Sequence, residues 1–227
     1  MIRSLVYDTL ILRMTSQWYR EVLDRVPDNI RMLDVGIGTA GALLTNAGAV
    51  RKKGISITGL DIDADYIERA RTRLAASPLR NQVTVLHQSL YDHQAGPYDV
   101  IYFSGSFMLL PAPGEALRHC CNLLAPGGRI YFTQTMQQKP SPWMERLKPA
   151  LRRLTSIDFG RVTYEREFRD QIRAAGLTLD EFSALQRHGS RTACLAIASG
   201  PVAGDDPKNG SWENKGTHHD HRNAGGH

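Results

Sequence analysis

The sequence predicts an α/β domain whose parallel sheet carries helices on both faces. Short segments rich in β-branched residues alternate along the chain with longer segments of helical periodicity, which is the pattern of such sheets. A glycine-rich turn separates the first short segment from the helix that follows it. The 227 residues are enough for one ordinary domain with a sizeable core, and too few for two large domains.

Seven short segments are predicted as strands. The first ends in glycine, the second ends directly before Asp61, and the fifth follows an Ala-Pro-Gly-Gly turn. The last two follow the final predicted helix. In chain order, the predicted strands are residues 30–35, 55–60, 83–87, 98–103, 129–135, 177–185 and 191–198.

Four longer segments are predicted as helices. The second of them places four apolar side chains, from Tyr66 to Leu74, on one face, and Pro78 stops its continuation. The last is followed by Gly176, which suits the end of a helix. The predicted helices are residues 40–52, 64–76, 115–124 and 165–175.

Composition limits the class of protein. Hydrophobic residues make up 41% and charged residues 22%, which excludes wholesale disorder, and no apolar run is long enough to predict a transmembrane segment. The N-terminus does not resemble a signal peptide. Three cysteines, two of them adjacent, indicate free thiols rather than a disulfide framework, so we expect a cytoplasmic protein. The net charge of +5 is too mild to predict a nucleic-acid partner, and the oligomeric state stays open.

The chain divides into a domain and a tail. Residues 1–198 are the predicted domain, with 1–29 as an N-terminal cap and 136–162 as a second cap segment. Within the second cap, residues 139–153 carry five basic residues and one acid, so weak contact with an acidic surface is possible there. Residues 199–227 are rich in Gly, Asn, Asp and His and are predicted to be a disordered tail. No metal site is predicted.

The most informative motif is LDVGIGTAG, which follows the first strand and opens a helix. Gly36 and Gly38 permit a tight turn with backbone close to a ligand, and the helix that follows exposes unpaired N–H groups. Asp34, at the strand end, suits a ligand with a cationic amino group. Asp61, at the end of the second strand, suits both hydroxyls of a ribose, and the neighbouring Ile62 suits an adenine face.

These residues resemble the class I S-adenosylmethionine-dependent methyltransferases, over roughly residues 7–198. The family motif acid-x-Gly-x-Gly-x-Gly is matched at Asp34, Gly36 and Gly38, with Ala40 in place of the third glycine. The stretches YDVIYFSGSFMLLP and ALRHCCNLLAPGGRIYFTQT resemble later parts of the family domain. The resemblance implies a doubly wound Rossmann-like fold, with a seven-stranded, mostly parallel sheet and an antiparallel last strand.

The resemblance also implies S-adenosylmethionine as cofactor and extends the candidate site. Ser89 aligns with a position that usually carries an adenine-contacting Asp, and Leu90 with the next position. Ser104, at the end of the fourth strand, aligns beside the methionine moiety of the cofactor. The expected reaction is methyl transfer to a small-molecule or lipid-like acceptor. Positioning can supply much of this catalysis, and none of the candidate bases, His87, His93 and His119, is assigned that role.

Aromatic side chains near the N-terminus and after the fourth strand are candidates for the acceptor pocket. They are Tyr7, Trp18, Tyr19 and Phe107. An amphipathic helix that simply packs on the sheet would explain the first three as well.

Other functions stay open from the sequence: a methyltransferase that acts on nucleic acid or on protein, and the two that follow. A nicotinamide-dependent oxidoreductase is compatible with Gly36-x-Gly38-x-x-Gly41 and Asp61, although Asp34 would repel a pyrophosphate. A non-catalytic cofactor-binding module is compatible with the departures at Ala40 and Ser89.

Overall fold

The computed structural model describes residues 2–137, 164–188 and 191–200, with side chains from residue 12 onward. The strands are β1 (Arg31–Val35), β2 (Ser56–Asp61), β3 (Val83–His87), β4 (Tyr98–Ser104), β5 (Leu124–Gln137), β6 (Thr178–His188) and β7 (Arg191–Ser199). The helices are α1 (Ile2–Leu23), α2 (Gly41–Thr45), α3 (Ala47–Lys52), α4 (Ala64–Ala75), α5 (Pro113–Leu123) and α7 (Glu165–Ala174), with short 3-10 turns η1 (Leu90–Asp92) and η2 (Phe107–Leu109).

The seven strands form one sheet in the order β3-β2-β1-β4-β5-β7-β6. The pairs β1–β2, β2–β3, β1–β4 and β4–β5 are parallel, whereas β7 is antiparallel to both of its neighbours. The strand order reverses between β1 and β4, and in open α/β sheets ligands bind beside the carboxyl ends of the strands at such a point. The predicted sheet, with its antiparallel last strand, is confirmed.

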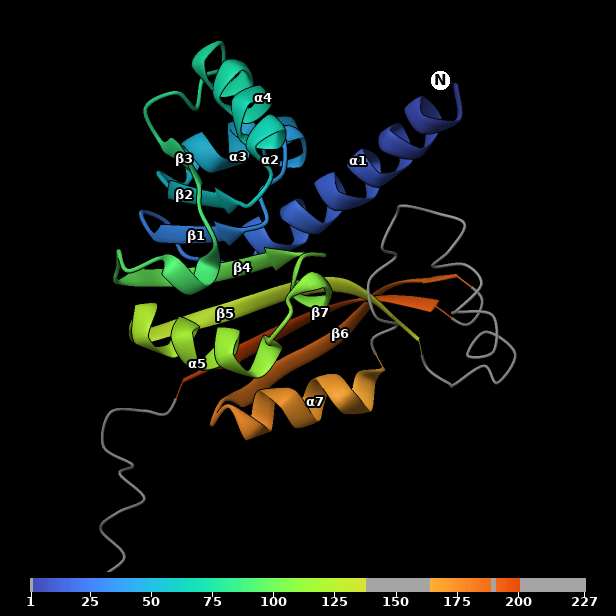
Figure 1. Ribbon diagram of the computed structural model, residues 1–227, viewed down its shortest axis with the longest axis vertical. Helices are drawn as coiled ribbons and strands as arrows, with labels where there is room; N and C mark the ends of the chain where they lie inside the picture. The colour runs from blue at the N-terminus through green and yellow to red at the C-terminus, as the bar shows by residue number, and fades with distance from the viewer. Residues whose placement is uncertain (1, 138–163, 189–190, 201–227) are drawn as a thin grey trace, which may run out of the picture.

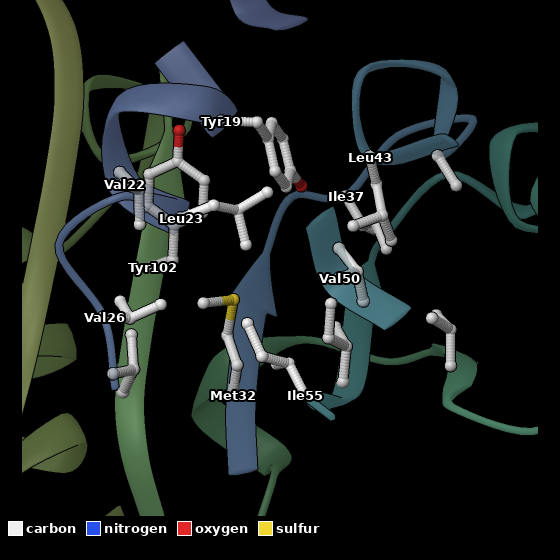
Figure 2. Packing of buried hydrophobic residues seen from close by; sticks show 14 of the residues in the cluster. Tyr19, Val22, Leu23, Val26, Met32, Ile37, Leu43, Val50, Ile55 and Tyr102 are labelled. Atoms are coloured by element: carbon white, nitrogen blue, oxygen red, sulfur yellow. The ribbon is translucent and has the colours of Figure 1, made fainter. Parts of the chain in front are cut away.

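Apolar residues on the two faces of the sheet form two hydrophobic cores. On one face, side chains of α1, α2, α3 and α4 pack over Met32, Tyr102 and their neighbours (Figure 2). On the other face, α5, α7 and both 3-10 turns pack over Leu33, Phe103 and Phe132. The sheet is therefore wound on both faces, as expected, and Figure 1 shows α1 leaving the body of the domain toward its N-terminus.

The predicted helix 40–52 is wrong in one respect, because the structure breaks it at Asn46 into α2 and α3. The Asn46 side chain is buried, and its amide nitrogen donates to the carbonyl oxygens of Ala42 and Ser16, each at 2.9 Å. An asparagine that binds backbone groups in this way competes with continuous helix. The break therefore ties α1 to the segment that follows the glycine turn.

The predicted start of the fifth strand at residue 129 is also revised, because β5 begins at Leu124. Leu124 pairs with Tyr98, and the pairing resumes only at Arg129 with Val100. Residues 125–128 thus form an irregularity inside the strand. Gly127 in this segment has a φ of +77°. The predicted Ala-Pro-Gly-Gly turn is therefore a bulge inside β5 and not a loop before it.

Several predicted segments fall wholly or partly outside the described residues. They include most of the second cap 136–162, the basic segment 139–153 and nearly all of the tail 199–227. The side chain of Tyr7 is also outside, although its backbone belongs to α1. Within the described parts, no helix has the length and apolar character needed to cross a bilayer.

Candidate functional site

Three predicted polar residues meet where β1, β2 and β4 end. The register pairs Asp34 with Gly59 of β2 and with Tyr102 of β4. Asp61 and Ser104 are each two residues further along their strands. Since residues two apart in a strand point to the same face, Ser104 lies on the Asp34 side of the sheet. The parallel topology thus brings together residues that are up to 70 positions apart in the sequence.

The turn after β1 depends on two glycines. Gly36 has a φ of +80°, and a Cβ at this position would lie 2.5 Å from the Cβ of Ser106. Gly38 has a φ of +58°, with open space where a Cβ would be. Gly36 donates its backbone N–H to Leu60 O at 2.8 Å, so the turn is pinned to the end of β2. Ala40 occupies the position of the third family glycine and keeps the left-handed conformation, with a φ of 56°.

Asp61 binds the glycine turn directly. Its Oδ2 accepts the backbone N–H of Gly38 at 2.8 Å, and its Oδ1 accepts the backbone N–H of Asp63 at 2.9 Å. The side chain is partly exposed. Each carboxylate oxygen accepts more than one hydrogen bond, so the group retains capacity for a ligand hydroxyl.

Asp34 is fully buried, and its two carboxylate oxygens differ in their surroundings. Oδ2 accepts a hydrogen bond from the Tyr19 hydroxyl of α1. Oδ1 has no partner among the described residues. Burial raises the pKa of Asp34 to about 7, a rise that the Tyr19 hydrogen bond opposes and the nearby Asp61 charge reinforces. A buried carboxylate oxygen without a hydrogen-bond partner lowers the stability of the folded protein. Its presence at the end of a strand therefore points to a function.

A second unpartnered polar atom lies on the same face. The Ser104 hydroxyl is inaccessible to solvent and has no hydrogen-bond partner in the described parts. Close by, the Tyr102 hydroxyl and Thr133 Oγ1 are 2.7 Å apart. The carboxyl ends of β1 and β4 therefore present one acceptor, Asp34 Oδ1, and one hydroxyl, Ser104 Oγ, that the described residues leave unpaired.

Other predicted cofactor residues have different surroundings. Ile62 is 76% exposed at the end of β2 and presents an uncovered apolar surface. The Ser89 hydroxyl accepts the backbone N–H of Tyr91 and caps η1. Leu90 is buried in the core that faces α5, so its side chain packs in that core.

The predicted acceptor-pocket residues are mostly buried. Phe107 packs against the rings of Phe103, Phe132 and Phe168 in the core. Trp18 and Tyr19 are also buried, and the Tyr19 ring meets the Tyr102 ring edge-on at 5.0 Å between centroids. The structure thus places Tyr19 on Asp34 rather than in an open pocket.

Sequence reasoning did not predict three contacts at this edge. Ser106 Oγ donates to Val35 O and fixes the turn after β4 against the glycine turn. Arg73 of α4 donates to Thr39 Oγ1 at 2.8 Å. Tyr102 faces Asp34 because the register pairs them. For Tyr102 a signal was available, because alternation along the strand places Tyr102 and Ser104 on the same face. No local signal in the sequence marked the contacts of Ser106 and Arg73.

Comparison with known proteins agrees with this geometry. The family model described as "Methyltransferase domain" matches residues 10–181, which is most of the chain. In the search of solved structures, the cyclase SpnF has a TM-score of 0.68 at 17% identity, with 82% of each chain covered. At this identity the similarity supports the fold alone.

Curated relatives are enzymes named ubiquinone biosynthesis O-methyltransferase. The protein of Vibrio parahaemolyticus serotype O3:K6 is 34% identical over 106 residues, which are 45% of this chain and 43% of that protein. The protein of Acinetobacter baumannii strain AYE is 28% identical over 164 residues, 68% of this chain and 66% of that protein. The chain therefore spans between about two fifths and two thirds of the length of these relatives.

The family match decides between the cofactors considered from the sequence. It covers both the glycine turn and the strand ends described above, and it supports S-adenosylmethionine rather than the nicotinamide alternative. The expected fold and family are confirmed: the chain belongs to the methyltransferase-domain family and is a class I S-adenosylmethionine-dependent methyltransferase domain.

Proposed function

We propose that this protein transfers the methyl group of S-adenosylmethionine to a small-molecule or lipid-like acceptor, and that the cofactor lies across the carboxyl ends of β1, β2 and β4. The observation that carries the proposal is the pair of unpartnered buried atoms, Asp34 Oδ1 and Ser104 Oγ, beside a turn that is open at Gly38. An α-ammonium group is the chemical partner that an unpaired carboxylate oxygen lacks.

The remaining residues fit the other parts of the cofactor. Asp61 is partly exposed and has acceptor capacity for ribose hydroxyls, and Ile62 offers an uncovered apolar surface for an adenine face. Gly38 allows backbone to approach the ligand closely. We propose that Ser89 contacts the cofactor through its backbone and through the hydrogen of its hydroxyl group, whose oxygen already accepts Tyr91 N–H. Leu90 would contact the cofactor through its backbone alone, because its side chain is in the core.

The bound cofactor supplies a methyl group on a cationic sulfur. The chain supplies orientation: Asp34 fixes the ammonium end of the ligand, Asp61 fixes its ribose, and the glycine turn between them sets the distance. Well-oriented reactants account for about 7–11 kcal/mol of barrier reduction in favourable cases. We assign no residue as a base.

The acceptor class rests on the relatives. The names of these relatives state O-methylation in ubiquinone biosynthesis, so an oxygen nucleophile on a ring, with or without a lipid chain, is the first class to test here. A cytoplasmic location is proposed as well, because the three cysteines of the chain are all free thiols.

Binding and turnover test the proposal separately. The full chain is titrated with S-adenosylmethionine, S-adenosylhomocysteine and NADH by calorimetry. Selective binding of the two sulfur nucleosides is expected, and a response to NADH alone would overturn the cofactor assignment. Release of S-adenosylhomocysteine is then measured with simple phenols and prenylated phenols. Binding without turnover on any acceptor would favour the non-catalytic module.

A further inference from the structure

The helix α1 is anchored to three segments that border the proposed cofactor site. Its Ser16 carbonyl oxygen accepts the Asn46 amide from the segment after the glycine turn, at 2.9 Å. Trp18 packs beside Gly105, where a Cβ would lie 3.4 Å from Trp18 Cζ3, in the turn after β4. Tyr19 binds Asp34 of β1. These three anchors occupy four consecutive residues of the helix.

The contact between Tyr19 and Asp34 differs from ordinary helix packing. Both side chains are buried, and the phenol oxygen donates to one carboxylate oxygen while the other stays unpaired. The hydrogen bond to one carboxylate oxygen and the burial of the group together restrict its rotation, which favours one direction for the free oxygen. Figure 2 shows Tyr19 and Tyr102 in the same packed layer, with Val22 and Leu23 of α1 beside them.

We propose that Tyr19 is a positioning residue of the cofactor site: its hydroxyl orients Asp34 toward the cofactor ammonium, which makes the docking of α1 a condition for tight cofactor binding. This inference rests on the proposed function, because it takes the cofactor ammonium to be the partner of Asp34 Oδ1. It assigns Tyr19 a part in the site other than the acceptor contact that the sequence suggested.

The groups around Asp34 define the pH dependence of this arrangement. Tyr19 faces it from α1, Tyr102 from β4 and Asp61 from β2, and no cation of the described chain contributes to its titration. Burial and the Asp61 charge favour the protonated acid, and only the Tyr19 hydrogen bond favours the carboxylate. The cofactor ammonium requires the carboxylate, so binding should tighten as the pH rises to about 7.

The test compares ligands with and without the amino-acid chain. We would measure the Kd of S-adenosylhomocysteine and of 5′-methylthioadenosine, which lacks the ammonium group, between pH 5.5 and 9. Tyr19→Phe keeps the ring and removes the hydroxyl. It should weaken S-adenosylhomocysteine about tenfold at pH 6.5 and move the pH midpoint up by about one unit, the size of one lost charge-assisted hydrogen bond. Binding of 5′-methylthioadenosine should not change.

Tyr98→Phe is the matched control, because it removes a buried hydroxyl at the opposite, amino-terminal end of β4, and that hydroxyl binds His93 Nε2 rather than Asp34. It should leave the pH midpoint in place. In an Asp34→Asn background, Tyr19→Phe should cause no further loss of affinity. Equal weakening of both ligands at every pH would show that Tyr19 is merely structural and would overturn the proposal.

A measurement on the unmodified chain keeps the proposal testable if Tyr19→Phe fails to fold. Hydrogen exchange at the amides of residues 15–23 should slow when S-adenosylhomocysteine binds, and slow much less with 5′-methylthioadenosine. Equal protection by both ligands would contradict a link through the ammonium. If the unmodified chain binds neither ligand, the proposed function fails; if it binds both and Tyr19→Phe changes nothing, only the role of Tyr19 fails.

Discussion

Asp61 Oδ2 accepts the backbone N–H of Gly38 at 2.8 Å, so the residue proposed to bind the ribose also holds the glycine turn. One carboxylate has both roles, so it sets the position of the ribose relative to the glycine turn. A change at Asp61 therefore acts on both parts of the cofactor site at once.

Asp61→Ala should weaken S-adenosylmethionine strongly. Each charge-assisted hydrogen bond contributes about 1.5–3 kcal/mol, so one lost bond predicts roughly 10- to 100-fold weaker binding by calorimetry. Asp63→Ala is the matched control, since the Asp63 side chain caps α4 by accepting Tyr66 N at 3.0 Å. It should cost about 1 kcal/mol of stability and leave the affinity nearly unchanged. An unaltered Kd for Asp61→Ala would contradict the ribose assignment.

The two turn glycines should respond differently to alanine. Both have positive φ, which costs an alanine about 1–2 kcal/mol. Gly36→Ala also forces its new Cβ to within 2.5 Å of Ser106 Cβ, whereas Gly38→Ala meets nothing within 4 Å. Thermal unfolding should therefore show a larger loss for Gly36→Ala than for Gly38→Ala.

A second change can isolate the steric part of the Gly36 effect. Ser106→Gly removes both side-chain atoms that the new methyl group would approach most closely. Added to Gly36→Ala, it should recover part of the lost melting temperature, despite losing the Ser106 hydrogen bond to Val35 O. If the double variant melts lower than Gly36→Ala alone, steric conflict is not the cause.

The centre of the sheet was predictable because β1, β4 and β7 are buried on both faces. Such strands are nearly continuous apolar segments, and the glycine turn and the strand-end acids mark where ligands bind. This logic located Asp34 and Asp61 correctly at the carboxyl edge of the sheet. The antiparallel last strand, by contrast, was predicted only from the family resemblance.

The parts that sequence reasoning missed depend on contacts between distant segments. Asn46 breaks a helix because a carbonyl oxygen of α1, 30 residues away, lies within reach of its amide. Leu90 and Phe107 were expected near ligands, but short 3-10 turns rotate both side chains into the core. Tyr19 and Asp34 meet only because α1 crosses the end of β1, and helix periodicity carries no information on that crossing.

Asp34→Asn should stabilise the ligand-free protein at alkaline pH while impairing cofactor binding. Burial raises the folded pKa of Asp34 above its ordinary value of 3.8 to about 7. The folded state therefore holds the proton more tightly, and stability falls as the pH rises from about 4 through 7. A shift of this size costs at most about 4 kcal/mol at pH 8, and the amide removes that cost.

Denaturant unfolding at pH 5 and pH 8 checks this expectation. The stabilisation by Asp34→Asn should be larger at pH 8 than at pH 5. Asp99→Asn is a suitable control, because Asp99 is exposed and accepts the backbone N–H of Arg31 at 2.8 Å. If Asp34→Asn has the same effect at both pH values, then burial does not disfavour the ionised form of Asp34 in the folded protein.

His93 should make the domain less stable as the pH falls. Its side chain is buried between Tyr98, at 2.9 Å from Nε2, and Gln88, at 3.0 Å from Nδ1. Burial, with a smaller contribution from His119, lowers its pKa below 6.5. The unfolded chain therefore binds this proton more readily, and stability is lost as the pH drops below about 6.5.

The change His93→Gln isolates this contribution from that of Asp34, which has the opposite sign in part of the same range. The free energy of unfolding, measured by urea between pH 5 and 7.5, should fall less steeply with decreasing pH in the variant than in the unmodified chain. His87→Gln is the control, since His87 is exposed and its Nε2 contacts Ile62 O, outside the hydrogen-bond network of His93. A slope unchanged by His93→Gln but changed by His87→Gln would mean that the acid sensitivity arises at the β3 terminus instead of the buried His93 network.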